Sequence, residues 1–176
     1  LEIAKLGKNL QIIHCVFFPE PSFDLPIFGI DVVAGPAGIS AAIVDLSPVS
    51  KNLPKTILNN LEKLKSPAFS KIRELPSWGT IFSPFVQFIR PDGKQDEDAF
   101  LELAKSYLTT LHAALLLTKA DSLNSPSTME RHEGQIIYCR QQKRNDKTRM
   151  LLAKAFNPIW AEKYLEELLF DEPGPL

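Results

Sequence analysis

Cysteine is scarce in this sequence, because only Cys15 and Cys139 occur among 176 residues. Their wide separation excludes a CxxC redox pair, and two thiolates are too few for an ordinary iron–sulfur cluster. We therefore expect both to be reduced, intracellular cysteines. Neither sign of charge is in large excess, because the formal net charge is −1. Without a global basic field we expect neither nucleic acid nor an anionic membrane surface as a partner.

Long apolar runs are missing as well, because the uninterrupted apolar stretches fall far short of the ~20 residues that cross a bilayer. A chain with 44% hydrophobic and 23% charged residues can bury one substantial core. Residues 1–8 show the spacing of the last turns of an amphipathic helix without a start signal. We therefore expect residues 1–176 to be a single domain that lacks its N-terminal segment.

Four segments rich in β-branched or aromatic residues are bounded by proline or glycine and predict strands. They are residues 11–18, 26–34, 39–46 and 81–90. The first three are too closely spaced for parallel crossovers, which favours an antiparallel meander with Gly35–Gly38 as a hairpin connection. Both faces of these strands are apolar, so the sheet needs a cover on each side.

Helical spacing of apolar residues predicts the covering elements. The expected helices are 54–64, 96–119, a third from Ser125-Pro126 to Arg140, and a last one from Asn157-Pro158 to Phe170. Both proline pairs combine an N-cap residue with a proline at the first helical position. The predicted fold class is α/β, a three-layer α/β/α sandwich with a central, mainly antiparallel sheet.

Familiar catalytic motifs are absent, since the sequence has no GxSxG elbow, no Cys-His signature and no GxGxxG fingerprint. The three histidines lack metal-ligand spacing, so we expect no metal site. Any redox electrons would therefore come from outside the chain.

Polar residues inside apolar strands are the informative ones, because a buried carboxylate needs a partner. Asp31 interrupts one apolar strand, and His14 interrupts the adjoining apolar strand. An Asp and a His lining one cavity can hold or pass a proton near neutral pH, which suits acid–base chemistry. A structural hydrogen-bonded pair explains the pattern equally well. Asp45 lies at a strand end, where turn capping is the expected role.

A basic stretch, Arg140–Arg149, separates two helical patterns and has two readings. As a charge run it is typical of a solvated connection. Alternatively, Lys147 and Arg73 hold the carboxylates of an anionic ligand through charge-assisted hydrogen bonds. Trp78 could close such a pocket, although a tryptophan in the core is the commoner outcome.

Taken together, these segments resemble the ferredoxin-dependent bilin reductases along nearly the whole chain. The segments that carry the resemblance are Glu2–Cys15, Leu25–Pro48, Arg73–Gly79, Gly134–Cys139, Asn145–Arg149 and Trp160–Tyr164. Several ordered motifs with compatible spacing are far more specific than any one of them.

The resemblance implies a pocket between the sheet and the C-terminal helices that holds biliverdin IXα. It implies that Asp31 is the central acid, that His14 is its partner in proton delivery, and that Glu2 donates the proton that accompanies reduction of the D-ring vinyl group. Asn145 would face the bilin. Ser40, Arg73 and Lys147 fall at positions where the family anchors the two propionates. Trp78 falls at a position that flanks the pocket.

The implied reaction is a reduction of biliverdin IXα to phycocyanobilin through bilin radicals. Reduced ferredoxin is the expected external electron donor, with no bound cofactor. The family resemblance further suggests a monomer in a cyanobacterial-type cytoplasm or a plastid stroma. Three alternatives stay open: a related reductase that makes another phycobilin such as phycoerythrobilin, a non-catalytic bilin carrier, and a generic α/β/α binding domain.

Overall fold

The computed structural model describes residues 1–7 and 9–176 and contains a five-stranded antiparallel sheet at its centre. The strands follow one another in the order of the sequence, as the predicted meander requires. They are β1 (Glu2–Leu6), β2 (Leu10–Phe17), β3 (Ile27–Gly35), β4 (Gly38–Ser47) and β5 (Gln87–Ile89). In the described part of the chain, no helix is long and apolar enough to span a membrane.

The helix predicted for residues 1–8 is wrong, because residues 2–6 form the edge strand β1; residue 8 lies outside the described residues. Along β1 the side chains alternate between partly buried and exposed, the period of a strand. Pairing with β2 satisfies the backbone groups on one side of β1, and Gly7 at φ 60° lies in the turn that follows it. The strand predicted for 81–90 was too long, since a 3₁₀ turn, η1 (Gly79–Ile81), occupies its start.

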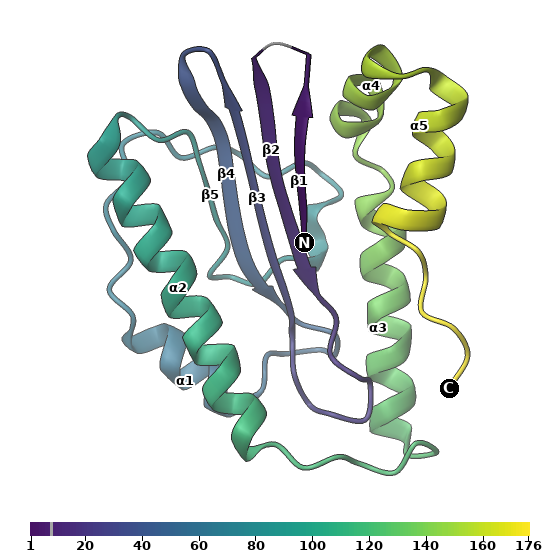
Figure 1. The fold of residues 1–176 in the computed structure, drawn as a ribbon. Coiled ribbons are helices and arrows are strands. Elements are labelled where there is room, and N and C mark those ends of the chain that lie inside the picture. Colours follow the sequence, from purple (N-terminus) through teal and green to yellow (C-terminus); the bar gives the residue numbers. More distant parts are fainter. Residues whose placement is uncertain (8) are drawn as a thin grey trace.

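Two helices cover one face of the sheet, namely α1 (Lys55–Lys63) and α2 (Lys94–Leu117) (Figure 1). The main core lies between them and the sheet. Ala42, Val44 and Leu46 of β4 pack there with buried side chains of α1 and α2. The alternation of β4 therefore aims one set of residues at this core and leaves the other set for the opposite face.

The opposite face carries the C-terminal helices α3 (Pro126–Gln142), α4 (Asp146–Ala155) and α5 (Pro158–Tyr164), followed by one π-helical turn, η2 (Leu165–Leu169) (Figure 1). A smaller apolar cluster joins these helices to one another. The three-layer α/β/α sandwich with an antiparallel sheet is therefore confirmed.

The basic stretch Arg140–Arg149 is not a plain connection, because α3 continues into it and α4 begins at Asp146. The side chain of Asn145 caps α4 by accepting a hydrogen bond from the backbone N–H of Thr148 at 3.4 Å. An Asn at the N-cap followed by an Asp in the first turn is a local sequence pattern that indicates the start of a helix. The predicted starts at Ser125-Pro126 and Asn157-Pro158 are both confirmed, each with its N-cap hydrogen bond.

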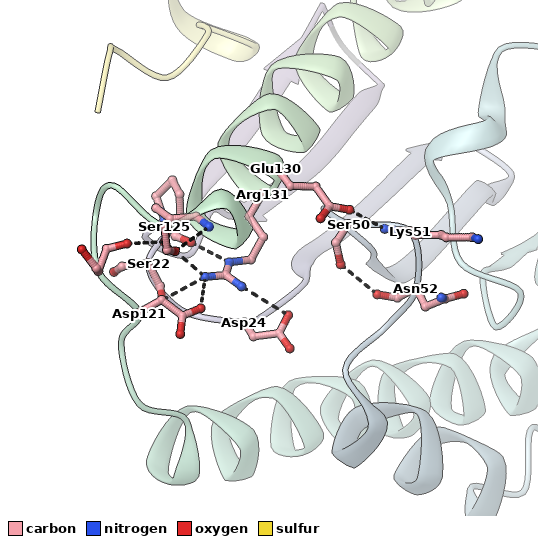
Figure 2. Close-up of polar contacts among 12 residues, drawn as sticks. Ser22, Asp24, Ser50, Lys51, Asn52, Asp121, Ser125, Glu130 and Arg131 are labelled. Carbon is pink, nitrogen blue, oxygen red and sulfur yellow. Dashed lines mark hydrogen bonds and ion pairs between the residues drawn. The ribbon is translucent and has the colours of Figure 1, made fainter.

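Helix α3 is fixed to the loop between β2 and β3 by Arg131, whose side chain is buried (Figure 2). Its guanidinium donates to the carbonyl of Pro21 and to the carboxylate of Asp121, both at 2.6 Å. On the same helix, a Cβ added to Gly134 would lie 1.9 Å from the carbonyl oxygen of Val49. This close approach brings α3 directly against the backbone that follows β4.

Candidate active site

A cavity of about 900 Å³ lies between the sheet and the C-terminal helices. Its volume is at the upper end of the range for small-molecule and cofactor sites, ~300–1,000 Å³. The sheet supplies the floor, because alternate residues of four strands point to this face. The floor residues are Glu2, Ala4, Leu6, Ile12, His14, Gly29, Asp31, Val33, Ala41, Ile43, Asp45 and Ser47.

Three ionisable residues form a row across the middle of this floor. Glu2 lies opposite His14 in the pairing of β1 with β2, and His14 lies opposite Asp31 in the pairing of β2 with β3. Directly paired residues of antiparallel strands share a face, so the three side chains are neighbours. His14 Nδ1 lies 2.5 Å from Asp31 Oδ1, as the sequence predicted for this pair.

The His14–Asp31 pair is suited to hold a proton. Burial lowers the pKa of His14, but the hydrogen bond to Asp31 and the charges of Asp31 and Glu2 together outweigh burial and raise it. The Asp31 side chain is 41% exposed, whereas His14 is only 13% exposed. A proton that the buried imidazole retains can therefore reach the cavity through the carboxyl group of Asp31.

The helical layer contacts this row directly through two aromatic residues that the sequence reading did not select. The hydroxyl of Tyr164, the last residue of α5, donates a hydrogen bond to Glu2 Oε2 at 2.5 Å. The ring of Phe170 meets the imidazole of His14 edge-on, with 5.6 Å between centroids. Tyr164 stood within a segment that carries the family resemblance, but helical periodicity gives no sign that its hydroxyl faces a carboxylate on a distant strand.

The turn from α3 into α4 brings Asn145 and Lys147 to the cavity wall. The side-chain oxygen of Asn145 is engaged in capping α4, while its other polar atoms remain available to a ligand. The ammonium group of Lys147 adds positive charge at the same wall, where Arg144 is also placed.

Arg73 and Trp78 line the cavity from the segment that precedes β5. Arg73 Nη1 donates to the backbone carbonyl of Ser40 at 2.8 Å, and its guanidinium lies 5.0 Å from the ring centroid of Phe88. The hydroxyl of Ser40 is directed at the sheet, where it donates to the carbonyl of Val33 at 3.1 Å. The contact of Ser40 with the cavity residue Arg73 is therefore made by its backbone carbonyl. Ser40 lies at the bulge in the β3–β4 pairing.

Asp45 does not cap a local turn as predicted, because its carboxyl is buried within β4. It accepts hydrogen bonds from the hydroxyl of Ser47 at 2.7 Å and from the backbone N–H of Ser83 at 2.8 Å. The hydroxyl of Ser83 donates to it as well, at 2.5 Å. Burial raises the pKa of Asp45 against the effect of these bonds. Its place in the structure is to tie the loop after η1 to the sheet.

Neither cysteine is poised for chemistry. Both thiols are buried, and burial raises the pKa of Cys139 to about 12 and that of Cys15 above its ordinary value. The thiolates that bind metals or attack substrates are therefore disfavoured. Within residues 1–7 and 9–176, no group of three or more His, Cys, Asp or Glu side chains is arranged to hold a metal ion.

Comparison with known proteins identifies the class to which this fold and cavity belong. The family model described as "Ferredoxin-dependent bilin reductase" matches residues 1–171. The chain therefore belongs to the ferredoxin-dependent bilin reductase family.

Within the family, the chain is similar to proteins named phycocyanobilin:ferredoxin oxidoreductase. It is 60% identical over 176 residues to that of Prochlorococcus marinus (strain MIT 9313), covering 100% of this chain and 67% of the relative. It is 57% identical over 173 residues to that of Synechococcus sp. (strain CC9902), covering 98% of this chain and 70% of the relative. The chain thus spans about two thirds of the length of these relatives.

A solved structure has the same fold. Phytochromobilin synthase from tomato, crystallised in complex with biliverdin, superposes with a TM-score of 0.74 at 18% identity. The match covers 96% of this chain and 63% of the tomato chain.

Proposed function

We propose that this chain is the catalytic part of an enzyme that reduces biliverdin IXα to phycocyanobilin with reduced ferredoxin as the electron donor. The row of Glu2, His14 and Asp31 on the floor of a cavity of about 900 Å³ carries the proposal. It supplies acids to a ligand-sized space, and the relatives named phycocyanobilin:ferredoxin oxidoreductase support this choice of substrate and product.

The proposed reaction adds four electrons and four protons to biliverdin. Ferredoxin delivers the electrons one at a time, so the reaction passes through bilin radicals, and the protein has to supply protons at the right atoms. Asp31 acts as the central acid toward the lactam and pyrrole groups, and His14 resupplies its proton across their 2.5 Å contact. Glu2 donates the proton that accompanies reduction of the D-ring vinyl group.

The cationic residues of the cavity wall account for binding of the two propionates. Arg73 presents a planar guanidinium that Phe88 and the carbonyl of Ser40 hold in place, and Lys147, in the first turn of α4, adds a second cation to the cavity lining. Asn145 faces the bilin from the start of α4, and Trp78 flanks the pocket with its aromatic face.

Ferredoxin is an external donor in this proposal, and no bound metal or organic cofactor takes part. The cationic residues that line the cavity, Arg73, Arg144 and Lys147, suit the approach of an acidic electron carrier. We further propose that the protein acts as a monomer in the cytoplasm, in line with the cyanobacterial sources of its relatives.

The test is an anaerobic assay of the intact reading frame with biliverdin, ferredoxin and an electron source, followed by chromatographic identification of the product. We expect phycocyanobilin from the unaltered enzyme and a loss of at least about 100-fold in rate for Asp31→Asn, the range for removal of an acid–base group. If the product is another reduced bilin, the enzyme is a related reductase and the assignment of phycocyanobilin as the product is wrong. A bilin that is bound but never reduced would identify a carrier instead.

A further inference from the structure

The hydrogen bond between Tyr164 and Glu2 joins the two walls of the cavity. Tyr164 ends α5 in the helical layer, while Glu2 begins β1 in the sheet, and the hydroxyl lies 2.5 Å from Oε2 of the carboxyl group. Glu2 also neighbours His14 in the row of ionisable residues. A contact made across 162 positions of sequence has to be held by the packing of both layers.

A stack of aromatic rings fixes the position of the Tyr164 hydroxyl. The ring of Tyr164 lies on that of Trp160, with 4.7 Å between centroids and 14° between planes. Trp160 in turn packs on Phe156, with 4.0 Å between ring centroids. These rings are spaced four residues apart, and Asn157 caps the turn by accepting a hydrogen bond from the N–H of Trp160 at 2.8 Å. The hydroxyl is therefore pre-organised toward Glu2.

The two oxygens of the Glu2 carboxyl group are made unequal by this contact. Burial raises the pKa of Tyr164, and the hydrogen bond and the charge of Glu2 raise it further, so the hydroxyl remains a donor throughout the neutral range. A hydrogen bond donated to Oε2 leaves Oε1 to carry the acidic proton. It also becomes stronger when the proton leaves, because charge-assisted hydrogen bonds are roughly twice as strong as neutral ones.

We propose that Tyr164 is a positioning residue for vinyl reduction: its hydroxyl orients the Glu2 carboxyl group, directs the transferable proton to Oε1 and stabilises the carboxylate that forms. The inference rests on the proposed function and deepens it. In the step concerned, the vinyl group takes up two electrons from reduced ferredoxin and two protons. One proton comes from Glu2, whose O–H bond breaks as a C–H bond forms; the second proton comes from solvent, which later also restores the proton on Glu2. Because the Tyr164 contact strengthens as charge develops, it favours the transition state over the ground state.

The decisive variant is Tyr164→Phe in the intact reading frame, which keeps the stacked ring and removes only the hydroxyl. We expect vinyl reduction to slow by about 10- to 100-fold, the range for loss of one hydrogen bond to a charged group. A partly reduced bilin that retains the D-ring vinyl group should accumulate, while the KM for biliverdin stays unchanged. Tyr107→Phe is the matched control, because its hydroxyl donates to the carbonyl of Phe85 at 2.6 Å in the other helical layer. The control should leave the product ratio unaltered.

Two further measurements separate positioning from a structural effect. Adding Tyr164→Phe to Glu2→Gln should cause no further change in product ratio, since the hydroxyl acts only through Glu2. In infrared difference spectra of the biliverdin-bound enzyme, the carbonyl band of protonated Glu2 should shift in Tyr164→Phe and vanish in Glu2→Gln.

The outcomes also distinguish this inference from the proposed function. If Glu2→Gln accumulates the partly reduced bilin while Tyr164→Phe gives the normal product and an unshifted band, only the role of Tyr164 is overturned. Additive effects in the double variant would likewise overturn it. If Glu2→Gln itself yields the normal product, or the unaltered enzyme reduces no biliverdin, the proposed function fails and the role of Tyr164 fails with it.

Discussion

At the scale of single residues, the chemistry of this protein depends on polar side chains placed in strands that are otherwise apolar. His14 and Asp31 could be selected from the sequence because each interrupts an apolar strand. Their contact followed from the expectation that neighbouring antiparallel strands pair. Glu2 could be selected only through the family resemblance, since residues 1–8 have a spacing that also suits a helix. Tyr164 and Phe170 could not be selected at all, because their partners lie on distant strands.

The raised pKa of His14 predicts a pH-dependent contribution to stability. A histidine whose pKa is higher in the folded state stabilises the fold fully below its unfolded value of about 6.5. That contribution is lost as pH rises through the folded pKa. We therefore expect His14→Gln to lower the free energy of unfolding more at about pH 5.5 than at about pH 8.5, as urea unfolding would show. His112→Gln, on the exposed side of α2, is the control and should change neither value appreciably. An equal loss at both pH values would show that the imidazolium–carboxylate pair does not stabilise the fold.

At the scale of elements, local signals placed most helices and strands but failed where two patterns coincide. The sequence of β1 fits a helix or a strand, and pairing with β2 decides between them. The polar residues before α4 read as a connection, although Asn145 caps a helix there. The predicted strand does not begin directly after η1, because hydrogen bonds to Asp45 hold Ser83 in a loop.

The approach of α3 to the sheet predicts a large effect of one methyl group. In Gly134→Ala the added Cβ would lie 1.9 Å from the carbonyl oxygen of Val49, so the helix has to move. We expect a loss of about 3 kcal/mol in the free energy of unfolding, at the upper end of overpacking effects, despite the better helix propensity of alanine. Gly35→Ala is the matched control, because an added Cβ there meets no atom within 4 Å. Urea denaturation of both variants measures the difference, and comparable stability of the two would contradict the role of Gly134.

At the scale of the whole molecule, the cavity lies on the face of the sheet where the helical layer shares less of the core with it. The layer of α1 and α2 shares the main core with the sheet, whereas α4 and α5 contribute to a smaller cluster. Substrate binding between the sheet and the smaller cluster would therefore act on the less stable layer.

Hydrogen exchange provides the corresponding test. Without bilin, we expect backbone amides of α4 and α5 to exchange faster than those of β3 and β4, since fewer buried contacts hold them. Saturating biliverdin should slow exchange in α4 and α5, because a ligand that binds only the folded helical layer stabilises it against local unfolding. Helix α2 is the internal control, because it packs on the opposite face of the sheet. Equal protection of α2 and α5 by the bilin would argue against binding in this cavity.

The sequence by itself determined the α/β class, the antiparallel meander and the identity of the two interrupting polar residues, because these follow from local periodicity and from the cost of burying an unpaired charge. The tertiary structure alone decided that residues 2–6 are a strand, that Glu2, His14 and Asp31 form one row, and that Tyr164 reaches Glu2. The reason is physical: register and interlayer contacts depend on which distant surfaces pack together, and no local pattern in the chain encodes that choice.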